Sequence, residues 1–160
     1  MKLLRSLVPY IIIIVVVVFV RTFIITPVKV NGNSMYPTLA GNEIMLLNKL
    51  GDIDRFDIVV VQLEGEDSNL IKRIIGLPGE TVEIRENHIY IDGQMLEDEY
   101  GYGATYNIDP VDLEEDEYFI LGDNRIVSLD SRAFGKITRS EIKGTTNFIM
   151  YPFNKIGKAE

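Results

Sequence analysis

Residues 81–93 read Thr-Val-Glu-Ile-Arg-Glu-Asn-His-Ile-Tyr-Ile-Asp-Gly, and two short runs within them alternate apolar with polar residues. Side chains two residues apart share one face of a β-strand, so Thr81–Arg85 and His88–Ile91 are predicted to be strands. Glu86-Asn87 between the runs and Asp92-Gly93 after them are tight-turn signals. This stretch therefore predicts a β-hairpin followed by a further turn.

Short apolar runs separated by Gly, Asn, Asp and Pro continue on both sides of the hairpin. Apart from a short turn at 140–143, no long stretch beyond residue 28 has a helical period, so we expect a mainly β domain of many short strands. Residues 94–117 are rich in acid, Gly and Tyr and are predicted to be a long surface excursion. The further strands are predicted at Val28–Val30, Ile44–Leu47, Asp57–Leu63, Leu70–Ile75, Tyr118–Leu121 and Thr145–Ile149.

The N-terminal segment has a different character. Leu7 to Val20 carry no charge, and Tyr10 to Val20 are Tyr, Ile, Val and Phe only. This run is too long for a strand, and extending it to Thr26 gives a helix of about 30 Å, the thickness of a hydrocarbon core. No Ala-x-Ala-like cleavage pattern follows it, which argues against a removable signal peptide. The sequence predicts one N-terminal transmembrane helix at 7–27, which separates a short N-terminus at 1–6 from a β domain at 28–160.

Composition excludes several classes of function. The net charge of −8 argues against nucleic acid as a partner, because phosphate neutralisation needs a basic face. The absence of cysteine excludes disulfides, thiolate metal sites and cysteine nucleophiles. A single histidine, His88, makes a zinc centre or a Ser-His-Asp triad hard to build. We therefore expect no metal and no cofactor.

The charge is arranged in blocks. Residues 1–30 carry +4, residues 31–131 carry −16 and residues 132–160 carry +4. This pattern indicates either that both basic ends lie near an anionic surface or that a solvated acidic face lies between ends that are basic by chance. Lys2 and Arg5 before the apolar run balance Arg21 and Lys29 after it, so the charges leave the orientation of the anchor undecided.

Three segments contain polar residues that a purely structural role does not explain. Residues 30–39 place Ser34 in a turn rich in Gly, Asn and Pro, residues 69–80 place Lys72 in an apolar strand, and residues 121–132 form a polar loop that begins with Leu-Gly-Asp-Asn-Arg. A lysine among apolar neighbours can lose its proton near neutral pH and activate a serine hydroxyl. The adjacent Arg73 cannot serve as a base, because guanidinium does not deprotonate in proteins. The separate Ser140-x-x-Lys143 match is four residues without supporting motifs, and we discount it.

In chain order, these segments resemble the serine box, the lysine box and the Gly-Asp-Asn-Arg box of bacterial type I signal (leader) peptidases, in the short Gram-positive-like form. Asp57-Ile-Val-Val-Val61 resembles the strand block between the first two boxes. The resemblance spans roughly residues 5–150 and rests on several motifs together. Gly32 stands where one branch of the family has a serine that donates to the oxyanion, which leaves the second oxyanion donor open. Ile126-Val127 is more apolar than the family box.

The resemblance implies a role for each matching residue. Ser34 would be the acylating nucleophile, with its own backbone N–H meeting the oxyanion, and Lys72 would be the general base. Ser128 would orient the Lys72 amine. The supporting residues implied are the ion pair of Asp130 and Arg132, and the loop residues Gly122, Asp123, Asn124 and Arg125.

The resemblance also implies a signal-peptidase-like β fold and a membrane-anchored serine endopeptidase that removes signal peptides from exported preproteins. Its partners would be preprotein signal peptides and the lipid bilayer, near the secretion translocon. Its N-terminus at 1–6 would be cytoplasmic, and its catalytic domain at 28–160 would lie on the outer face of the plasma membrane. Two alternatives remain: a self-cleaving Ser-Lys protease of the repressor type, and an anchored β domain that binds peptides without cutting them.

Overall fold

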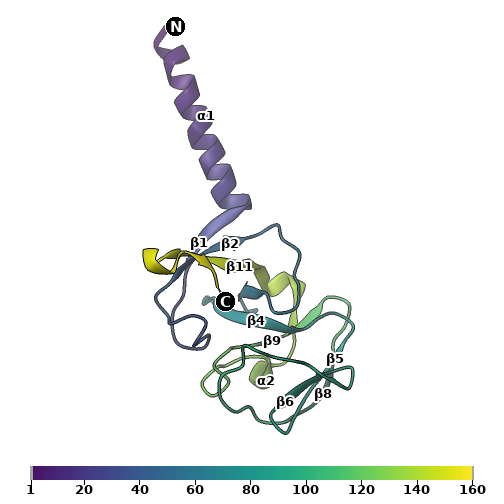
Figure 1. Ribbon diagram of the computed structural model, residues 1–160. Helices are drawn as coiled ribbons and strands as arrows, with labels where there is room; N and C mark the ends of the chain where they lie inside the picture. Colours follow the sequence, from purple (N-terminus) through teal and green to yellow (C-terminus); the bar gives the residue numbers. More distant parts are fainter. Residues whose placement is uncertain (1, 160) are drawn as a thin grey trace.

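The computed structural model consists of a long N-terminal helix and a β domain (Figure 1), and it describes residues 2–159, with side chains from residue 7 onward. The helical elements are α1 (Lys2–Phe23), α2 (Ser131–Phe134) and the 3₁₀ turns η1 (Arg139–Glu141) and η2 (Phe153–Lys155). The strands are β1 (Ile25–Lys29), β2 (Ile44–Asn48), β3 (Ile58–Val61), β4 (Leu70–Gly76), β5 (Thr81–Arg85), β6 (His88–Ile91), β7 (Gln94–Met95), β8 (Ile108–Asp112), β9 (Glu117–Leu121), β10 (Ile137–Thr138), β11 (Ile142–Tyr151) and β12 (Gly157–Lys158).

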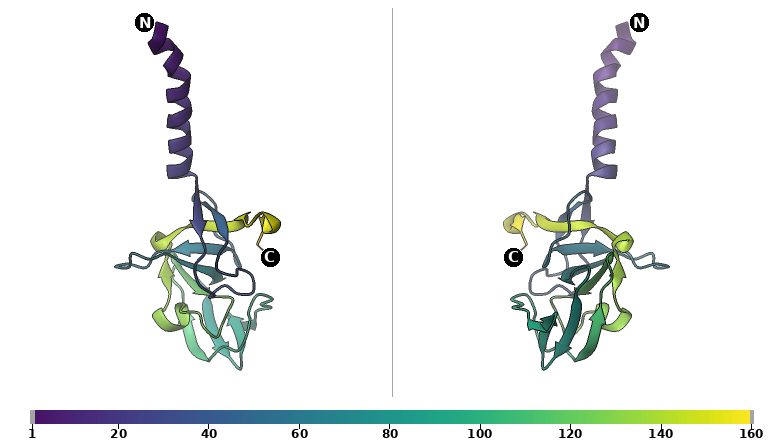
Figure 2. Two further views of the ribbon diagram at one scale, coloured as in Figure 1. Left: turned by 90° about the vertical axis from the view of Figure 1, so that its left-hand side faces the viewer. Right: turned by 90° about the vertical axis from the view of Figure 1, so that its right-hand side faces the viewer.

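The strands form two sheets, which Figure 2 shows from two sides. The larger sheet has the order β1-β2-β11-β3-β4-β9-β10, with β12 paired to β11, and the smaller has the order β7-β6-β5-β8. All the strand pairings within these sheets are antiparallel. β1 lies at one end of the larger sheet, so it is an edge strand beside the segment that carries Ser34.

β4 links the hydrophobic cores of the two sheets because its side chains alternate between its faces. Ile74 packs with Val59 and Ile120 in the core of the larger sheet. Ile75 packs instead with Val82 and other side chains of the smaller sheet. Since both faces of β4 are covered, a polar side chain on this strand lies in an apolar environment.

The hairpin predicted at residues 81–91 is confirmed. β5 pairs with β6 from Val82↔Ile91 to Arg85↔His88. Glu86 and Asn87 both have positive φ values, 49° and 67°, as a two-residue turn that matches the strand twist requires. The strands predicted near β2, β4 and β9 are also present.

Residues 94–117 were predicted to be a surface excursion, and the structure corrects this. They contain β7, β8 and the start of β9, and Tyr102 pairs with Asn124 in an isolated bridge. β8 pairs with β5, and its Ile108 and Val111 pack against the core of the smaller sheet. The high acid content hid this edge strand, because only two of its five residues are apolar and turned inward.

The N-terminal helix ends at Phe23, and β1 begins two residues later. The chain leaves the helix here because Ile25 to Lys29 pair with β2, from Ile25↔Asn48 to Lys29↔Ile44. α1 extends away from the β domain (Figure 1), and its apolar side chains between Leu7 and Val20 are exposed. No helix in the described part of the chain combines the length and the apolar character that a membrane span needs.

Candidate active site

Ser34 and Lys72 line the same cleft, which has a volume of about 560 Å³. Its walls come mainly from β1 and the turn after it, and from β4 and the segment before it. Lys72 is only 3% exposed, whereas Ser34 is half-buried at the rim of the domain. The fold therefore brings the two side chains to one cavity, although neither lies near the other in the sequence.

Burial lowers the pKa of Lys72 from 10.5 to about 8. The negative charges of Asp130 and Asp123 act in the opposite direction, and Arg132 adds to the decrease. Loss of water is the largest effect, because an ammonium ion is poorly stabilised among the apolar side chains of a strand. A lysine with this pKa holds a useful fraction of free amine near neutral pH and can accept a proton.

The carboxylate of Glu43 fixes the loop that carries Ser34. It accepts hydrogen bonds from the backbone N–H groups of Ala40 and Asn42 at 3.0–3.1 Å and from Lys155 at 2.8 Å. Burial by itself raises the pKa of Glu43, but the bond from Lys155 and the backbone donors outweigh it and lower the pKa to about 2. The Glu43 carbonyl also accepts from Val30 N, so both ends of the loop are held by one residue.

The loop after β9 lies directly against Ser34. Asn124 N donates to the Ser34 carbonyl at 3.0 Å, and Asn124 Nδ2 donates to the Asn33 carbonyl at 3.2 Å. At Gly122, a Cβ atom would collide with the Ser34 carbonyl and with the Ser128 side chain. Only glycine fits here, because it lets the serine turn and Ser128 approach the same point of the backbone. The Ser128 hydroxyl is buried and has no hydrogen-bond partner within the described residues.

Asp130 and Arg132 form a buried ion pair behind this loop, with 2.7 Å between Arg132 Nε and Asp130 Oδ1. Asp130 Oδ2 also accepts from Gly122 N at 2.9 Å, and Arg132 Nη1 donates to the Arg125 carbonyl at 2.8 Å. Asp130 further caps the short helix α2 through Arg132 N. The pair therefore ties both ends of the 122–130 loop together and holds Ser128 in place.

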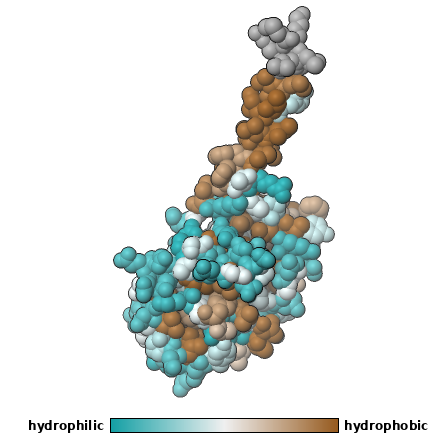
Figure 3. All heavy atoms as spheres, turned by 180° about the vertical axis from the view of Figure 1, so that it is seen from behind, coloured by the Kyte–Doolittle hydropathy of each residue, from teal (hydrophilic) through white to brown (hydrophobic). Residues whose placement is uncertain are grey.

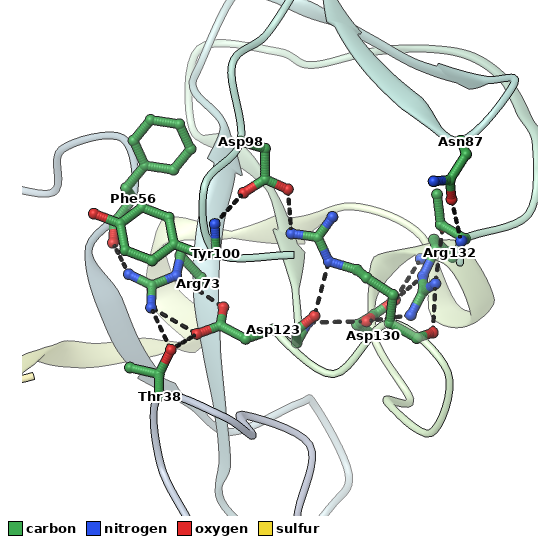
Figure 4. Close-up of polar contacts among 12 residues, drawn as sticks. Thr38, Phe56, Arg73, Asn87, Asp98, Tyr100, Asp123, Asp130 and Arg132 are labelled. Carbon is green, nitrogen blue, oxygen red and sulfur yellow. Dashed lines mark hydrogen bonds and ion pairs between the residues drawn. The ribbon is translucent and has the colours of Figure 1, made fainter. Parts of the chain in front are cut away.

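A second buried ion pair joins Arg73 to Asp123, and the sequence analysis did not identify it (Figure 4). Arg73 Nε and Nη2 donate to the two carboxylate oxygens of Asp123 at 2.8 and 2.6 Å. Thr38 also donates to Asp123, and the Tyr100 ring stacks 3.6 Å from the Arg73 guanidinium. An arginine in a strand buried on both faces must have a buried partner, so the sequence signals that a partner exists but not which residue it is.

Lys72 and Arg73 line different cavities. Lys72 lines the cleft with Ser34, whereas Arg73 lines a separate cavity with Thr38 and Tyr100. Arg125 is likewise turned to a structural partner, since its Nη2 lies 2.5 Å from Asp98 Oδ2 and its Nε donates to the Gly122 carbonyl. Of the predicted residues, Ser34 and Lys72 line the cleft, whereas the supporting residues do not: Gly122, Asp123, Asn124, Arg125, Ser128, Asp130 and Arg132.

The other candidate side chains lie elsewhere. His88 is exposed at the start of β6, with its Nδ1 2.8 Å from the Glu86 carbonyl oxygen. Ser140 is exposed in η1 and lies 2.8 Å from Thr138 Oγ1. Neither residue lines the cleft that contains Ser34 and Lys72. No group of three or more potential metal ligands occurs in the part of the chain that the structure describes.

Comparisons with known proteins place most of this chain in one family. The family model described as "Signal peptidase, peptidase S26" matches residues 3–151. Signal peptidase I S of Bacillus subtilis (strain 168) is 40% identical, over 91% of this chain and 87% of its own. Signal peptidase I of Bacillus amyloliquefaciens is 39% identical, over 94% of this chain and 89% of its own.

A solved structure shows the same likeness. The crystal structure of a signal peptidase I from Enterococcus faecalis V583 matches with a TM-score of 0.54 at 32% sequence identity, and the match covers 59% of this chain and 97% of that one. The family model alone covers most of the chain, and it includes the segments of Ser34, Lys72 and the 122–132 loop. The chain therefore belongs to the signal peptidase family, peptidase S26, and is similar to the type I enzymes of Bacillus.

Proposed function

We propose that the protein is a membrane-anchored serine endopeptidase that cleaves signal peptides from exported preproteins with a Ser34–Lys72 dyad. Membership of the signal peptidase family supports the reaction. The proposal of a Ser34–Lys72 dyad rests on one observation: the two residues line the same cleft, and burial lowers the pKa of Lys72 to about 8. No cofactor is needed, because the nucleophile, the base and the oxyanion donor all belong to the chain.

In the proposed mechanism, the Lys72 amine takes the proton of Ser34 Oγ as that oxygen attacks the carbonyl carbon of the scissile peptide bond. The Ser34 backbone N–H donates to the developing oxyanion, and no group among the described residues accepts a hydrogen bond from it. The Lys72 ammonium then gives its proton to the departing amine of the mature chain. A water molecule then attacks the acyl carbon while Lys72 accepts its proton, and the Lys72 ammonium returns that proton to Ser34 Oγ as the bond from the acyl carbon to this oxygen breaks.

Ser128 and the ion pair behind it are positioning residues in this scheme. The buried Ser128 hydroxyl has no partner among the described residues, so it is available to the Lys72 amine. Asp130 and Arg132 hold the loop through Gly122 N and the Arg125 carbonyl. Asp123, Asn124 and Arg125 keep the same loop against the serine turn.

The substrate would bind in extended form along β1. Because β1 is an edge strand that borders the cleft, its free backbone groups can pair with the signal peptide as an added strand. Apolar side chains such as Val28 and Ile71 line the cleft and would leave shallow pockets. These pockets would accept Ala or Gly at the residues one and three before the cut, where a bulky aromatic side chain would prevent processing.

We further propose that α1 anchors the enzyme in the plasma membrane. Its apolar side chains are exposed on all sides, and they form the apolar stalk above the more polar domain in Figure 3. Apolar surface of this extent is unfavourable in water and favourable in lipid. The N-terminus would be cytoplasmic and the β domain extracytoplasmic, near the secretion translocon. Protease added to intact protoplasts should then digest the β domain, and protection of that domain until the membrane is permeabilised would contradict this orientation.

The dyad is tested by processing of a preprotein with purified full-length variants in detergent. Ser34→Ala and Lys72→Ala should each abolish cleavage, and so should Lys72→Arg, because guanidinium cannot accept the serine proton. His88→Ala is the matched control and should stay close to wild type, since His88 is exposed and away from the cleft.

The pH dependence gives a second readout. The kcat/KM of the wild type should rise through pH 8, as Lys72 loses its proton. An acylating inhibitor should label Ser34.

Two outcomes would contradict the proposal. A folded Lys72→Arg variant that still cleaves would refute the role of Lys72 as general base. A wild-type chain that binds signal peptides without cutting them would be a binding domain and not an enzyme.

A further inference from the structure

The loop that holds Ser128 contains exposed apolar side chains that its structural role does not explain. Ile126 is 67% exposed and Val127 is 62% exposed, while Asp123 and Arg125 in the same loop are buried. Solvent contact with large aliphatic side chains costs free energy. Two adjacent ones beside a proposed active site therefore indicate a surface that is covered when the enzyme works.

Two tyrosines extend this surface, and the backbone fixes their position. Tyr102 N donates to the Asp123 carbonyl at 2.7 Å, and Arg125 N donates to the Tyr102 carbonyl at 3.0 Å. The rings of Tyr36 and Tyr102 meet edge to face, with centroids 5.5 Å apart. Both tyrosines are about half exposed. We call Tyr36, Tyr102, Ile126 and Val127 together the apolar ledge.

The position of Ile126 in the ledge depends on a specific packing contact. Ile126 lies over Gly103, where a Cβ atom would collide with the Ile126 side chain. A glycine at this position lets the isoleucine lie flat against the 100–103 segment. The ledge is therefore a shaped surface made from three separate parts of the chain.

The ledge adjoins Ser34 but is separate from the cleft. Tyr36 follows Ser34 by two residues, and Ile126 follows Asn124, whose N–H binds the Ser34 carbonyl at 3.0 Å. None of the four ledge residues lines the cleft with Lys72. A substrate that lies in the cleft up to its scissile bond must leave past Ser34, and the ledge is an apolar surface within two residues of that point.

We propose that the apolar ledge binds the side chain of the second residue after the cut, and that this residue is preferred when it is large and apolar. The inference rests on the proposed function. In an extended substrate, alternate side chains share a face, so residues three and one before the cut face the enzyme together with the second residue after it. That second residue lies about 7 Å beyond the scissile bond. Ile126 lies two residues along the chain from Asn124, whose N–H binds the Ser34 carbonyl, in the turn at 125–127.

The surroundings of the ledge favour a peptide over a lipid surface. Residues 87–123 contain no Lys or Arg, and Arg125 is paired with Asp98. A surface that contacts anionic lipid usually presents free basic side chains. The short helix α2, which directly follows the loop, lies in the half of the domain away from α1 (Figure 1).

The test compares three preproteins that differ only at the second mature residue, which is Leu, Ala or Gln. Wild-type full-length enzyme in detergent should cleave the Leu substrate with a kcat/KM roughly tenfold above that of the Gln substrate. The double variant Ile126→Gln, Val127→Thr should reduce this ratio to below about twofold while it still cleaves the Ala substrate. Leu50→Gln is the matched control, because Leu50 is 69% exposed and outside the ledge, and it should keep the wild-type ratio.

Each outcome decides one claim. A wild-type ratio near one, or an unchanged ratio in the double variant, overturns the ledge as a substrate site even if cleavage is normal. Altered vesicle binding or self-association in the double variant, with the ratio unchanged, likewise overturns it in favour of lipid or a second copy. Absence of cleavage of all three preproteins by the wild type would instead refute the proposed function.

Discussion

Replacing Lys72 with methionine should abolish activity and stabilise the fold. The pKa of Lys72 falls from 10.5 to about 8 because the ammonium is buried. One pKa unit corresponds to about 1.4 kcal/mol, so the folded state carries a cost of about 3 kcal/mol whenever Lys72 is protonated. Methionine has a similar length and no charge to bury, so the free energy of unfolding of Lys72→Met should exceed that of the wild type by up to about 3 kcal/mol at pH 7.

The gain should depend on pH in a defined way. Below pH 8 Lys72 is protonated in both states and the whole cost is present. Between pH 8 and 10.5 the folded chain has released the proton and the unfolded chain has not, so the stability of the wild type rises with pH. Above 10.5 both states are neutral and the advantage of Lys72→Met should vanish.

Urea titrations of full-length protein in detergent at pH 7, 9 and 10.5 measure this difference, with Lys143→Met, on the exposed surface, as the control. An advantage of Lys72→Met that is absent at pH 7, or that stays constant up to pH 10.5, would refute the reasoning that burial depresses this pKa.

Three further perturbations test the surroundings of the site. Gly122→Ala should lower kcat/KM about 100-fold, because its Cβ would displace the Ser34 carbonyl, while circular dichroism should show that the fold is retained. Near-normal activity would show that catalysis does not need the close contact between Gly122 and the Ser34 carbonyl. Asp123→Asn should cost about 3–5 kcal/mol in urea denaturation, since it leaves the Arg73 charge buried without its partner. Glu43 has a pKa of about 2 when folded, so the advantage of the wild type over Glu43→Gln should be complete above pH 4.5 and decline towards pH 2; a difference that does not change with pH would contradict this.

The strands that could be predicted from the sequence are those with a simple local signal. The 81–91 hairpin shows both strict alternation and turn residues, and both appear in the structure with the expected register. β8 escaped prediction because it has Pro110 and two aspartates among its five residues and is held by pairing to β5. Its inward-facing side chains contribute to a core that is visible only when the smaller sheet is assembled.

The residues of the candidate site likewise divide into those that the sequence could indicate and those that it could not. Ser34 and Lys72 could be selected because the serine turn, the lysine strand and the Gly-Asp-Asn-Arg loop together resemble the boxes of one family, whereas Lys72 alone would be read as a surface lysine on a strand. The partners of Arg73 could not be selected, since Asp123, Thr38 and Tyr100 come from three distant segments. Local sequence indicates that a buried charge needs a partner, but only the tertiary fold says which residue provides it.

In the proposed Ser34–Lys72 mechanism, the adjacent basic residues of β4 make catalysis depend on correct strand pairing. Lys72 and Arg73 occupy opposite faces, and β3 holds them in register through Val59↔Lys72 and Ile58↔Arg73. A slip of one residue would reverse every side chain of β4, present a permanently charged guanidinium to Ser34 and leave Asp123 facing an amine. Such a chain would hold all the same residues and remain inert. A protease built in this way has no activity until its sheet is correctly paired, so the fraction of molecules that an acylating inhibitor can label counts the correctly folded chains.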